Sequence, residues 1–172
     1  RAYQVWNEPN IYPEWGEQNV DAAAYTDLLC RTYAALKAVD PAIVVISGAL
    51  APTAALDGRN LTDVAFLQQM YDAGAGACFD VLAVNGYGLR SGPTDRRMRP
   101  MIMNYGRNQW IRDIMVANGD AAKPIWISEM NWNPVPEPEE VPDIAGRYDY
   151  GQVTEEQQAR WVPLAYERAR LE

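Results

Sequence analysis

Two carboxylates in this sequence each follow an apolar, strand-like segment. Glu8 comes after residues 3–7 and before Pro9, which keeps the chain from continuing as helix or sheet. Glu129 directly follows residues 125–128. If both segments are strands of one parallel sheet, the two carboxylates lie at its carboxyl edge, where such sheets keep catalytic groups. Paired carboxylates without metal ligands suit hydrolysis of a glycosidic bond, in which one acts as general acid and the other as nucleophile or base.

Polar and aromatic side chains near the same strand ends could assist this chemistry. Asn7 could hold a sugar hydroxyl, and Tyr87 could donate a hydrogen bond to Glu129. Aromatic rings in strand-to-helix loops offer flat faces for stacking on sugar rings, and Trp15 and Trp132 are the candidates. Each ring taken singly also fits the simpler role of an anchor for its loop.

The composition excludes several classes of chemistry. The chain has no histidine, which removes Ser-His-Asp and Cys-His catalysis and the usual zinc sites. Acid–base work must therefore fall to carboxylates, tyrosines or lysines, and we expect no metal and no cofactor. A net charge of -8, from 15 basic and 23 acidic residues, argues against a nucleic acid or an anionic membrane as a partner. No apolar run approaches the roughly 20 residues that cross a bilayer.

The two cysteines carry little information in the sequence. Cys30 and Cys78 fall in different expected elements and form no Cys-x-x-Cys pattern. We expect both to be buried free thiols, because cysteine commonly behaves as a small core residue. No signal peptide is visible, and secreted and cytoplasmic locations both stay open.

Apolar spacing predicts strands and helices in alternation along the chain. The expected strands are residues 3–7, 43–46, 81–84 and 125–128. The expected helices are residues 21–39, 62–73, 108–117 and 154 to the end, the last opening with a capping-box pattern. Alternation of this kind indicates a parallel sheet with right-handed crossovers, either a barrel or an open sheet. The long strand-to-helix loops, residues 86–107 and 131–153, would lie on the same side as the strand-end polar residues.

These motifs resemble those of clan A retaining glycoside hydrolases, in particular bacterial family 39 and family 5-like enzymes. Residues 6–10, Trp-Asn-Glu-Pro-Asn, are similar to the acid/base signature at the end of the fourth strand. Residues 127–132 are similar to the nucleophile signature at the end of the seventh, and residues 79–88 to the sixth strand with its tyrosine. That group holds β-xylosidases and cellulase-type glycanases.

The resemblance implies a role for each candidate residue. Glu8 would be the acid/base, Glu129 the nucleophile, Asn7 the ligand of the sugar 2-hydroxyl, and Tyr87 the group that orients Glu129. Members of the clan are retaining, so the two carboxyl groups should lie about 5–5.5 Å apart. Relatives often carry histidine where Asn85 stands; asparagine can still donate a hydrogen bond to a sugar hydroxyl but does not titrate.

The resemblance covers strands four to seven alone. It implies a partial (β/α)8 TIM barrel with about four consecutive βα units, and residues 1–172 as a single domain from the C-terminal half of a glycosidase barrel. Such a piece would expose two parallel-sheet edges and could self-associate through them.

Two other classes of function stay open beside hydrolysis of β-linked oligo- or polysaccharides. The chain could be a catalytically inert fragment or a non-catalytic carbohydrate-binding relative. A phosphate- or nucleotide-binding α/β protein is disfavoured, because no glycine-rich loop leads from an expected strand into a helix.

Overall fold

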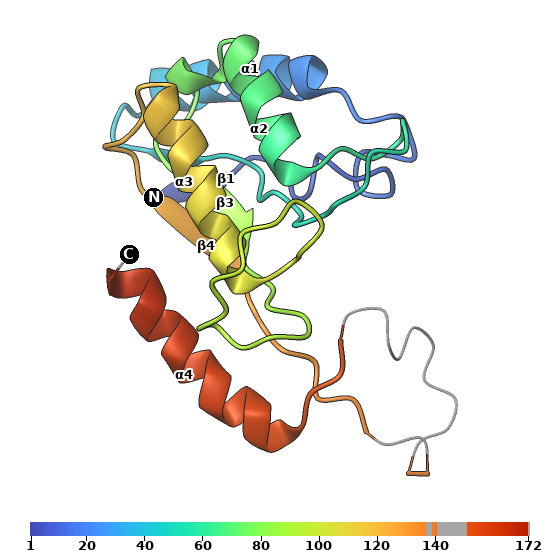
Figure 1. Cartoon of the computed structure of the whole chain (residues 1–172). Coiled ribbons are helices and arrows are strands. Elements are labelled where there is room, and N and C mark those ends of the chain that lie inside the picture. The colour runs from blue at the N-terminus through green and yellow to red at the C-terminus, as the bar shows by residue number, and fades with distance from the viewer. Residues whose placement is uncertain (137–138, 141–150, 172) are drawn as a thin grey trace. The chain divides into compact units, whose positions relative to one another are not determined.

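The computed structural model describes residues 1–136, 139–140 and 151–171 (Figure 1). Its strands are β1 (Ala2–Gln4), β2 (Val44–Ile46), β3 (Leu82–Asn85) and β4 (Ile125–Glu129). Its helices are α1 (Ala22–Val39), α2 (Asp63–Asp72), α3 (Asn108–Ala117) and α4 (Glu155–Leu171), with short 3-10 turns η1 (Ala75–Ala77) and η2 (Tyr105–Arg107). The helices and strands predicted from apolar spacing are therefore confirmed to within a few residues.

The chain divides into two compact units. The first comprises Arg1–Asn85 and Asn108–Ser128, and the second comprises Gly86–Arg107 and Glu129–Glu172. Of the expected loop at 131–153, residues 137–138 and 141–150 lie outside the described residues. That residues 1–172 are part of a larger glycosidase domain stays a prediction.

The predicted fold, a partial TIM barrel whose four βα units share one parallel sheet, is wrong. β1 pairs with β2 and β3 pairs with β4, in two separate two-stranded parallel sheets. Isolated bridges join Ile46 to Val81 and Leu50 to Val84, but they do not form a ladder. The ladder is interrupted because the side-chain Oγ of Ser47, and not a backbone carbonyl, accepts a hydrogen bond from the Ala83 N–H at 2.9 Å.

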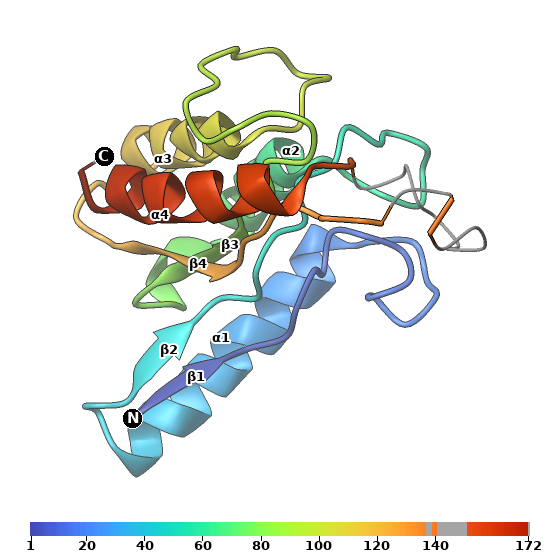
Figure 2. The ribbon, with the colours of Figure 1, turned by 90° about the horizontal axis from the view of Figure 1, so that it is seen from below.

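One face of the first unit's strands is covered by helices (Figures 1 and 2). Figure 2 shows β1 and β2 side by side, with α1 running next to them. The core beneath the helices combines apolar side chains of the strands and of α1, α2 and α3, among them Val45, Leu82, Leu29, Phe66 and Met115. Such burial supplies most of the favourable free energy of folding and holds the strand ends in place.

Side-chain caps define where the helices begin. In α1, Asp21 Oδ1 accepts hydrogen bonds from the N–H groups of Ala23 and Ala24, both at 2.9 Å. At the start of α4, the Gln157 N–H donates to Thr154 Oγ1 at 3.1 Å, and Gln157 Oε1 accepts from the Thr154 N–H at 2.8 Å. This reciprocal pair is the capping box predicted from the sequence. Among the described residues, no helix is long and apolar enough to cross a membrane.

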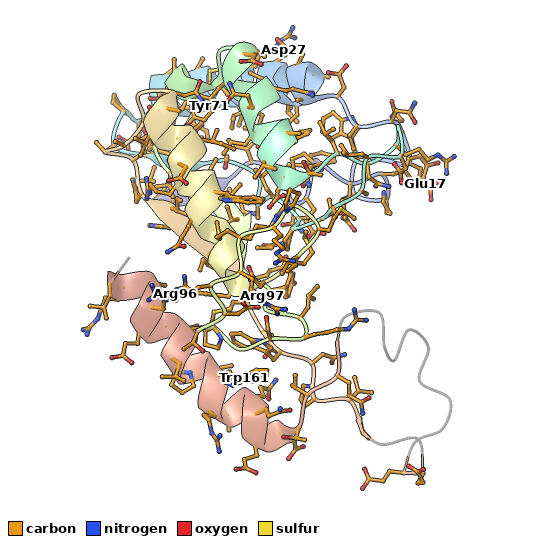
Figure 3. All side chains as sticks on the ribbon, in the orientation of Figure 1. Glu17, Asp27, Tyr71, Arg96, Arg97 and Trp161 are labelled. Atoms are coloured by element: carbon orange, nitrogen blue, oxygen red, sulfur yellow. A yellow bond between two sulfur atoms is a disulfide. The ribbon has the colours of Figure 1, made fainter. Side chains whose placement is uncertain are left out.

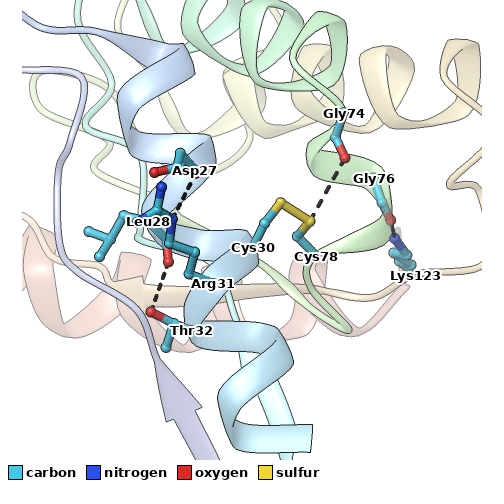
Figure 4. The surroundings of a disulfide bond; sticks show 9 residues. All are labelled: Asp27, Leu28, Cys30, Arg31, Thr32, Gly74, Gly76, Cys78 and Lys123. Atoms are coloured by element: carbon cyan, nitrogen blue, oxygen red, sulfur yellow. Dashed lines mark hydrogen bonds and ion pairs between the residues drawn. A yellow bond between two sulfur atoms is a disulfide. The ribbon is translucent and has the colours of Figure 1, made fainter.

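Cys30 and Cys78 form a disulfide, so the prediction of free thiols is wrong. Figure 4 shows the bond between α1 and the end of η1. The two Cα atoms lie 4.7 Å apart, although 48 positions separate the residues in the sequence. Packing of α1 against η1 brings the cysteines together, and no local pattern in the sequence announces that contact.

Candidate active site

Glu8 lies just beyond β1 in the first unit, in a constrained turn. Its backbone φ is 48°, in the left-handed region that non-glycine residues seldom adopt. The Glu8 N–H donates to the Ala49 carbonyl at 2.8 Å, and Asn7 forms a parallel bridge with the same residue. Glu8 is half-buried, and these two contacts with Ala49 fix the backbone that carries its carboxylate.

Tyr25, on α1, holds the end of β1 in place through its hydroxyl group. Its hydroxyl donates to the Val5 carbonyl at 3.0 Å and accepts from the Gly48 N–H at 2.5 Å. Burial raises the pKa of Tyr25, and this outweighs the opposing effect of the Gly48 hydrogen bond, so the phenol keeps its proton. One α1 side chain therefore connects the end of β1 to the turn after β2.

Asn10 is a structural residue of the site that sequence reasoning missed. Its Nδ2 donates to the carbonyls of Ala51 and Leu61 at 2.9 and 3.1 Å, and its Oδ1 accepts from the Ala51 N–H at 2.8 Å. The buried side chain satisfies three backbone groups of the loop that follows β2. Its position directly after Asn-Glu-Pro is the sequence feature that could have indicated this structural role.

Asn85, at the end of β3, contacts Glu8. The Asn85 Nδ2 donates to Glu8 Oε1 at 2.7 Å, across 77 positions of sequence. The Asn85 side chain is 2 % exposed, and its Oδ1 is buried without a hydrogen-bond partner. The first unit therefore brings together the carboxylate and an amide that had been predicted to bind sugar.

Glu129 and Tyr87 come together in the second unit. The hydrogen bond predicted from the sequence is present: the Tyr87 hydroxyl donates to Glu129 Oε2. The Gly86 N–H also donates to the Glu129 carbonyl at 2.8 Å, which fixes the backbone on which this carboxylate stands. Glu129 itself is exposed to solvent.

The two candidate tryptophans lie in different environments. Trp15 is partly exposed and packs edge to face against Trp6 and Tyr25, with ring centroids 5.5 and 6.1 Å apart. Trp132 is 1 % exposed; its Nε1 donates to the Ser91 carbonyl at 2.7 Å, and its ring packs against Trp161. Figure 3 shows that Trp161 comes from α4. Trp132 thus packs the second unit, and its contact with a sugar stays a prediction.

Trp6 is a further aromatic that the candidate set omitted. Its ring is 47 % exposed, its Nε1 donates to the Glu14 carbonyl at 3.0 Å, and its φ is 76°. Left-handed backbone at a bulky residue is strained, and such strain clusters at functional sites. In the sequence, Trp6 stood in an expected strand and in the Trp-Asn-Glu-Pro-Asn signature, and neither pattern gave its side chain a role.

The site residues thus form two clusters. Glu8, Asn85, Asn7 and Trp15 belong to the first unit, and Glu129, Tyr87 and Trp132 belong to the second. The separation of about 5–5.5 Å between the two carboxyl groups stays a prediction of the retaining mechanism. Within the described residues, no group of three or more acidic, cysteine or histidine side chains could hold a metal ion.

Comparison with known proteins adds no family to this description. No family model matches the chain, and no curated protein matches it at a significant level.

Proposed function

We propose that this chain carries the two catalytic carboxylates of a retaining glycoside hydrolase that acts on β-linked oligo- or polysaccharides. The observation that carries the proposal is that each candidate carboxylate accepts a hydrogen bond from a side chain. Both donors lie at the end of β3 or within two residues after it. Asn85 donates to Glu8, and Tyr87 donates to Glu129. Fixed hydrogen-bond donors of this kind hold a catalytic carboxyl group in one orientation.

The reaction would proceed in two displacements. Glu129 attacks the anomeric carbon, while Glu8 gives its proton to the leaving oxygen as the glycosidic C–O bond breaks. The resulting glycosyl ester on Glu129 is then hydrolysed by a water molecule, whose proton passes to the Glu8 carboxylate. Each carboxylate returns to its starting state, and the configuration of the sugar is retained.

Two of the remaining candidates, Asn7 and Trp15, would bind the sugar. Asn7 is adjacent to the acid/base residue and would contact the 2-hydroxyl, as the resemblance implies. Trp15 presents part of its ring at the surface of the first unit and would stack on a sugar face. Trp132 would act mainly by holding the segment that follows Glu129.

The test is turnover of a panel of aryl β-glycosides by the chain and by Glu8→Gln and Glu129→Gln. We expect each substitution to reduce turnover by at least about 100-fold, because each removes a group that reacts directly. The matched control is Glu156→Gln, which changes an exposed carboxylate on α4 whose ion pair with Arg160 lies at the surface. Near-normal activity of both site variants would contradict the assignment.

Azide separates the two roles. With the smaller variant Glu8→Ala, azide should attack the glycosyl ester and give a β-glycosyl azide. With Glu129→Ala, azide should replace the missing nucleophile and give the α-anomer. Binding of an oligosaccharide without turnover by the unmodified chain would instead support a non-catalytic carbohydrate-binding protein.

A further inference from the structure

The contact between Asn85 and Glu8 is anchored at both ends. The Glu8 N–H is bonded to the Ala49 carbonyl at 2.8 Å, and the Asn85 N–H is bonded to the Leu50 carbonyl at 3.0 Å. Two consecutive residues of the segment after β2 therefore fix the two backbones from which the side chains meet. Because both backbones are fixed, the 2.7 Å hydrogen bond between Asn85 Nδ2 and Glu8 Oε1 has a defined geometry. It is not a chance contact between two freely rotating side chains.

Two local costs converge on the same pair. Glu8 adopts a φ of 48°, which is unfavourable for a residue with a side chain. Asn85 leaves its Oδ1 buried without a partner, and a buried unpaired acceptor is unfavourable because it has given up its hydrogen bonds to water. Strained backbone and orphaned polar atoms persist where function requires them, so their coincidence at one hydrogen bond points to a functional role for that bond.

We propose that Asn85 is a positioning residue that holds the carboxyl group of Glu8 for proton transfer and does not itself bind the sugar. This inference rests on the proposed function. Both polar atoms of the Asn85 side chain are enclosed by protein: Nδ2 is directed at Glu8, and Oδ1 is buried. Neither atom is presented to a ligand hydroxyl. The proposed role of Asn85 therefore differs from the sugar contact that was expected from the sequence.

An amide is well suited to this position. It cannot titrate, so its N–H donors are present at every pH at which the protein is folded. The bond therefore persists while Glu8 gains and loses its proton in the two displacements. Rotation of the amide by 180° would place Oδ1 against Glu8 Oε1, and repulsion between these oxygens favours the observed orientation while Glu8 is ionised.

The leaving group of the substrate distinguishes positioning from sugar binding. A phenyl β-glycoside needs protonation of its leaving oxygen, whereas a 2,4-dinitrophenyl β-glycoside does not. In Asn85→Leu, which keeps a similar volume but removes the donor, we expect kcat/KM to fall about 100-fold for the phenyl substrate. For the dinitrophenyl substrate it should stay about unchanged. Asn85→His, which restores an N–H donor, should recover part of the loss.

An equal loss for both substrates would overturn the inference, because removal of a sugar contact weakens binding whatever the leaving group is. No loss for either substrate would overturn it as well. The thermal unfolding midpoint of each variant is measured in parallel, so that a folding defect, which would reduce both activities together, is identified independently. In that case the spectroscopic test decides.

The second test does not depend on activity. The side-chain amide protons of Asn85 are followed by ¹H–¹⁵N NMR in the unmodified chain and in Glu8→Ala. A proton that donates to a carboxylate resonates downfield, so we expect an upfield shift in the variant. Asn60, whose Nδ2 donates to Asp57 Oδ2 at 2.8 Å, is an internal reference that should not move.

The two tests separate the inference from the function on which it rests. An unchanged Asn85 resonance in Glu8→Ala would overturn the positioning role even if the chain hydrolyses glycosides. A shifted resonance in a chain that turns over no substrate on the panel would overturn the proposed hydrolase, while the hold of Asn85 on Glu8 would stand.

Discussion

Gly48 lies where several groups of the candidate site converge. A Cβ atom at this position would lie 2.9 Å from the Val5 carbonyl oxygen, 3.0 Å from the Tyr25 hydroxyl and 3.3 Å from Pro9 Cδ. The first two of these neighbours are joined by a hydrogen bond, and the carbonyl is backbone, so neither can move away cheaply. Glycine is therefore required here by close approach, and not by an unusual φ.

We predict that Gly48→Ala lowers the free energy of unfolding by about 1–3 kcal/mol, because the added methyl group forces the strand end and Tyr25 apart. Urea unfolding followed by circular dichroism measures the change. The control is Gly76→Ala, whose Cβ would come no closer than 3.4 Å to the Tyr71 ring. Equal stability of the two variants would contradict the close-packing argument.

The Tyr25 hydroxyl contributes separately from its ring. Tyr25→Phe keeps the ring in the core but leaves the Val5 carbonyl and the Gly48 N–H without their partner. We expect a loss of about 1–3 kcal/mol in the free energy of unfolding, the usual cost of unpaired buried groups. Tyr33→Phe is the matched control on the same helix, because its hydroxyl makes only a long 3.5 Å contact with Asp80. If both variants unfold at the same urea concentration, the Tyr25 bonds do not stabilise the strand end.

At the scale of elements, Asp80 connects three parts of the first unit. From its place shortly before β3, its Oδ2 accepts from Lys37 Nζ of α1 at 2.7 Å and from the Val45 N–H of β2 at 2.8 Å. Partial burial acts to raise the pKa of Asp80, but the hydrogen bonds from Lys37 and Val45 and the charge of Lys37 outweigh it, so the pKa lies below its ordinary value of 3.8.

The lowered pKa of Asp80 gives a prediction for acid stability. A carboxyl group whose pKa is lower in the folded than in the unfolded protein stabilises the fold above its unfolded pKa, here the ordinary value of 3.8, and that contribution is lost as the pH falls through the folded pKa. Asp80→Asn should therefore be less stable than the unmodified chain at neutral pH, and the difference should shrink at about pH 3 and below. Urea midpoints measured across this range provide the test.

Asp27→Asn is the control for the Asp80 variant. Asp27 pairs with Arg31 on the exposed side of α1, and surface pairs of this kind contribute little to stability. Its free energy of unfolding should follow that of the unmodified chain at every pH. A difference between Asp80→Asn and the unmodified chain that stays constant down to the lowest pH would contradict the lowered pKa.

The helices could be predicted from the sequence because their signals are local. Apolar spacing and a capping box lie within one element, as at Thr154 and Gln157. The continuous sheet could not be predicted correctly, because pairing depends on distant groups: Ser47 accepts the Ala83 N–H that a ladder would have used. The disulfide of Cys30 and Cys78 was missed for the same reason.

The candidate site likewise contains one contact that could be predicted from the sequence and one that could not. The Tyr87–Glu129 hydrogen bond was predictable, because strand ends of a parallel sheet share one edge and the resemblance supplied the pairing. The role of Asn85 was not, because nothing near residue 85 shows that its amide meets Glu8 rather than a ligand. Contacts across 77 positions of sequence depend on how the whole first unit packs.

At the scale of the whole molecule, the disulfide covalently joins two segments that lie 48 positions apart in the sequence. The sequence contains two cysteines, and both are in this bond, within the first unit. The bond joins α1 to the end of η1, directly before the segment that carries Asp80 and leads into β3. It therefore stabilises the arrangement of helices on which Tyr25, Asp80 and the strand ends depend.

We predict that the double variant Cys30→Ser/Cys78→Ser loses about 4 kcal/mol of unfolding free energy, because the bond closes a loop of 48 positions and restricts the unfolded chain. Urea unfolding of the unmodified chain in reductant should show a similar loss. Reductant should leave the double variant unchanged, since it contains no other cysteine. A reductant effect on the double variant, or none on the unmodified chain, would contradict this account. Replacing both cysteines together avoids an unpaired thiol that could exchange between chains.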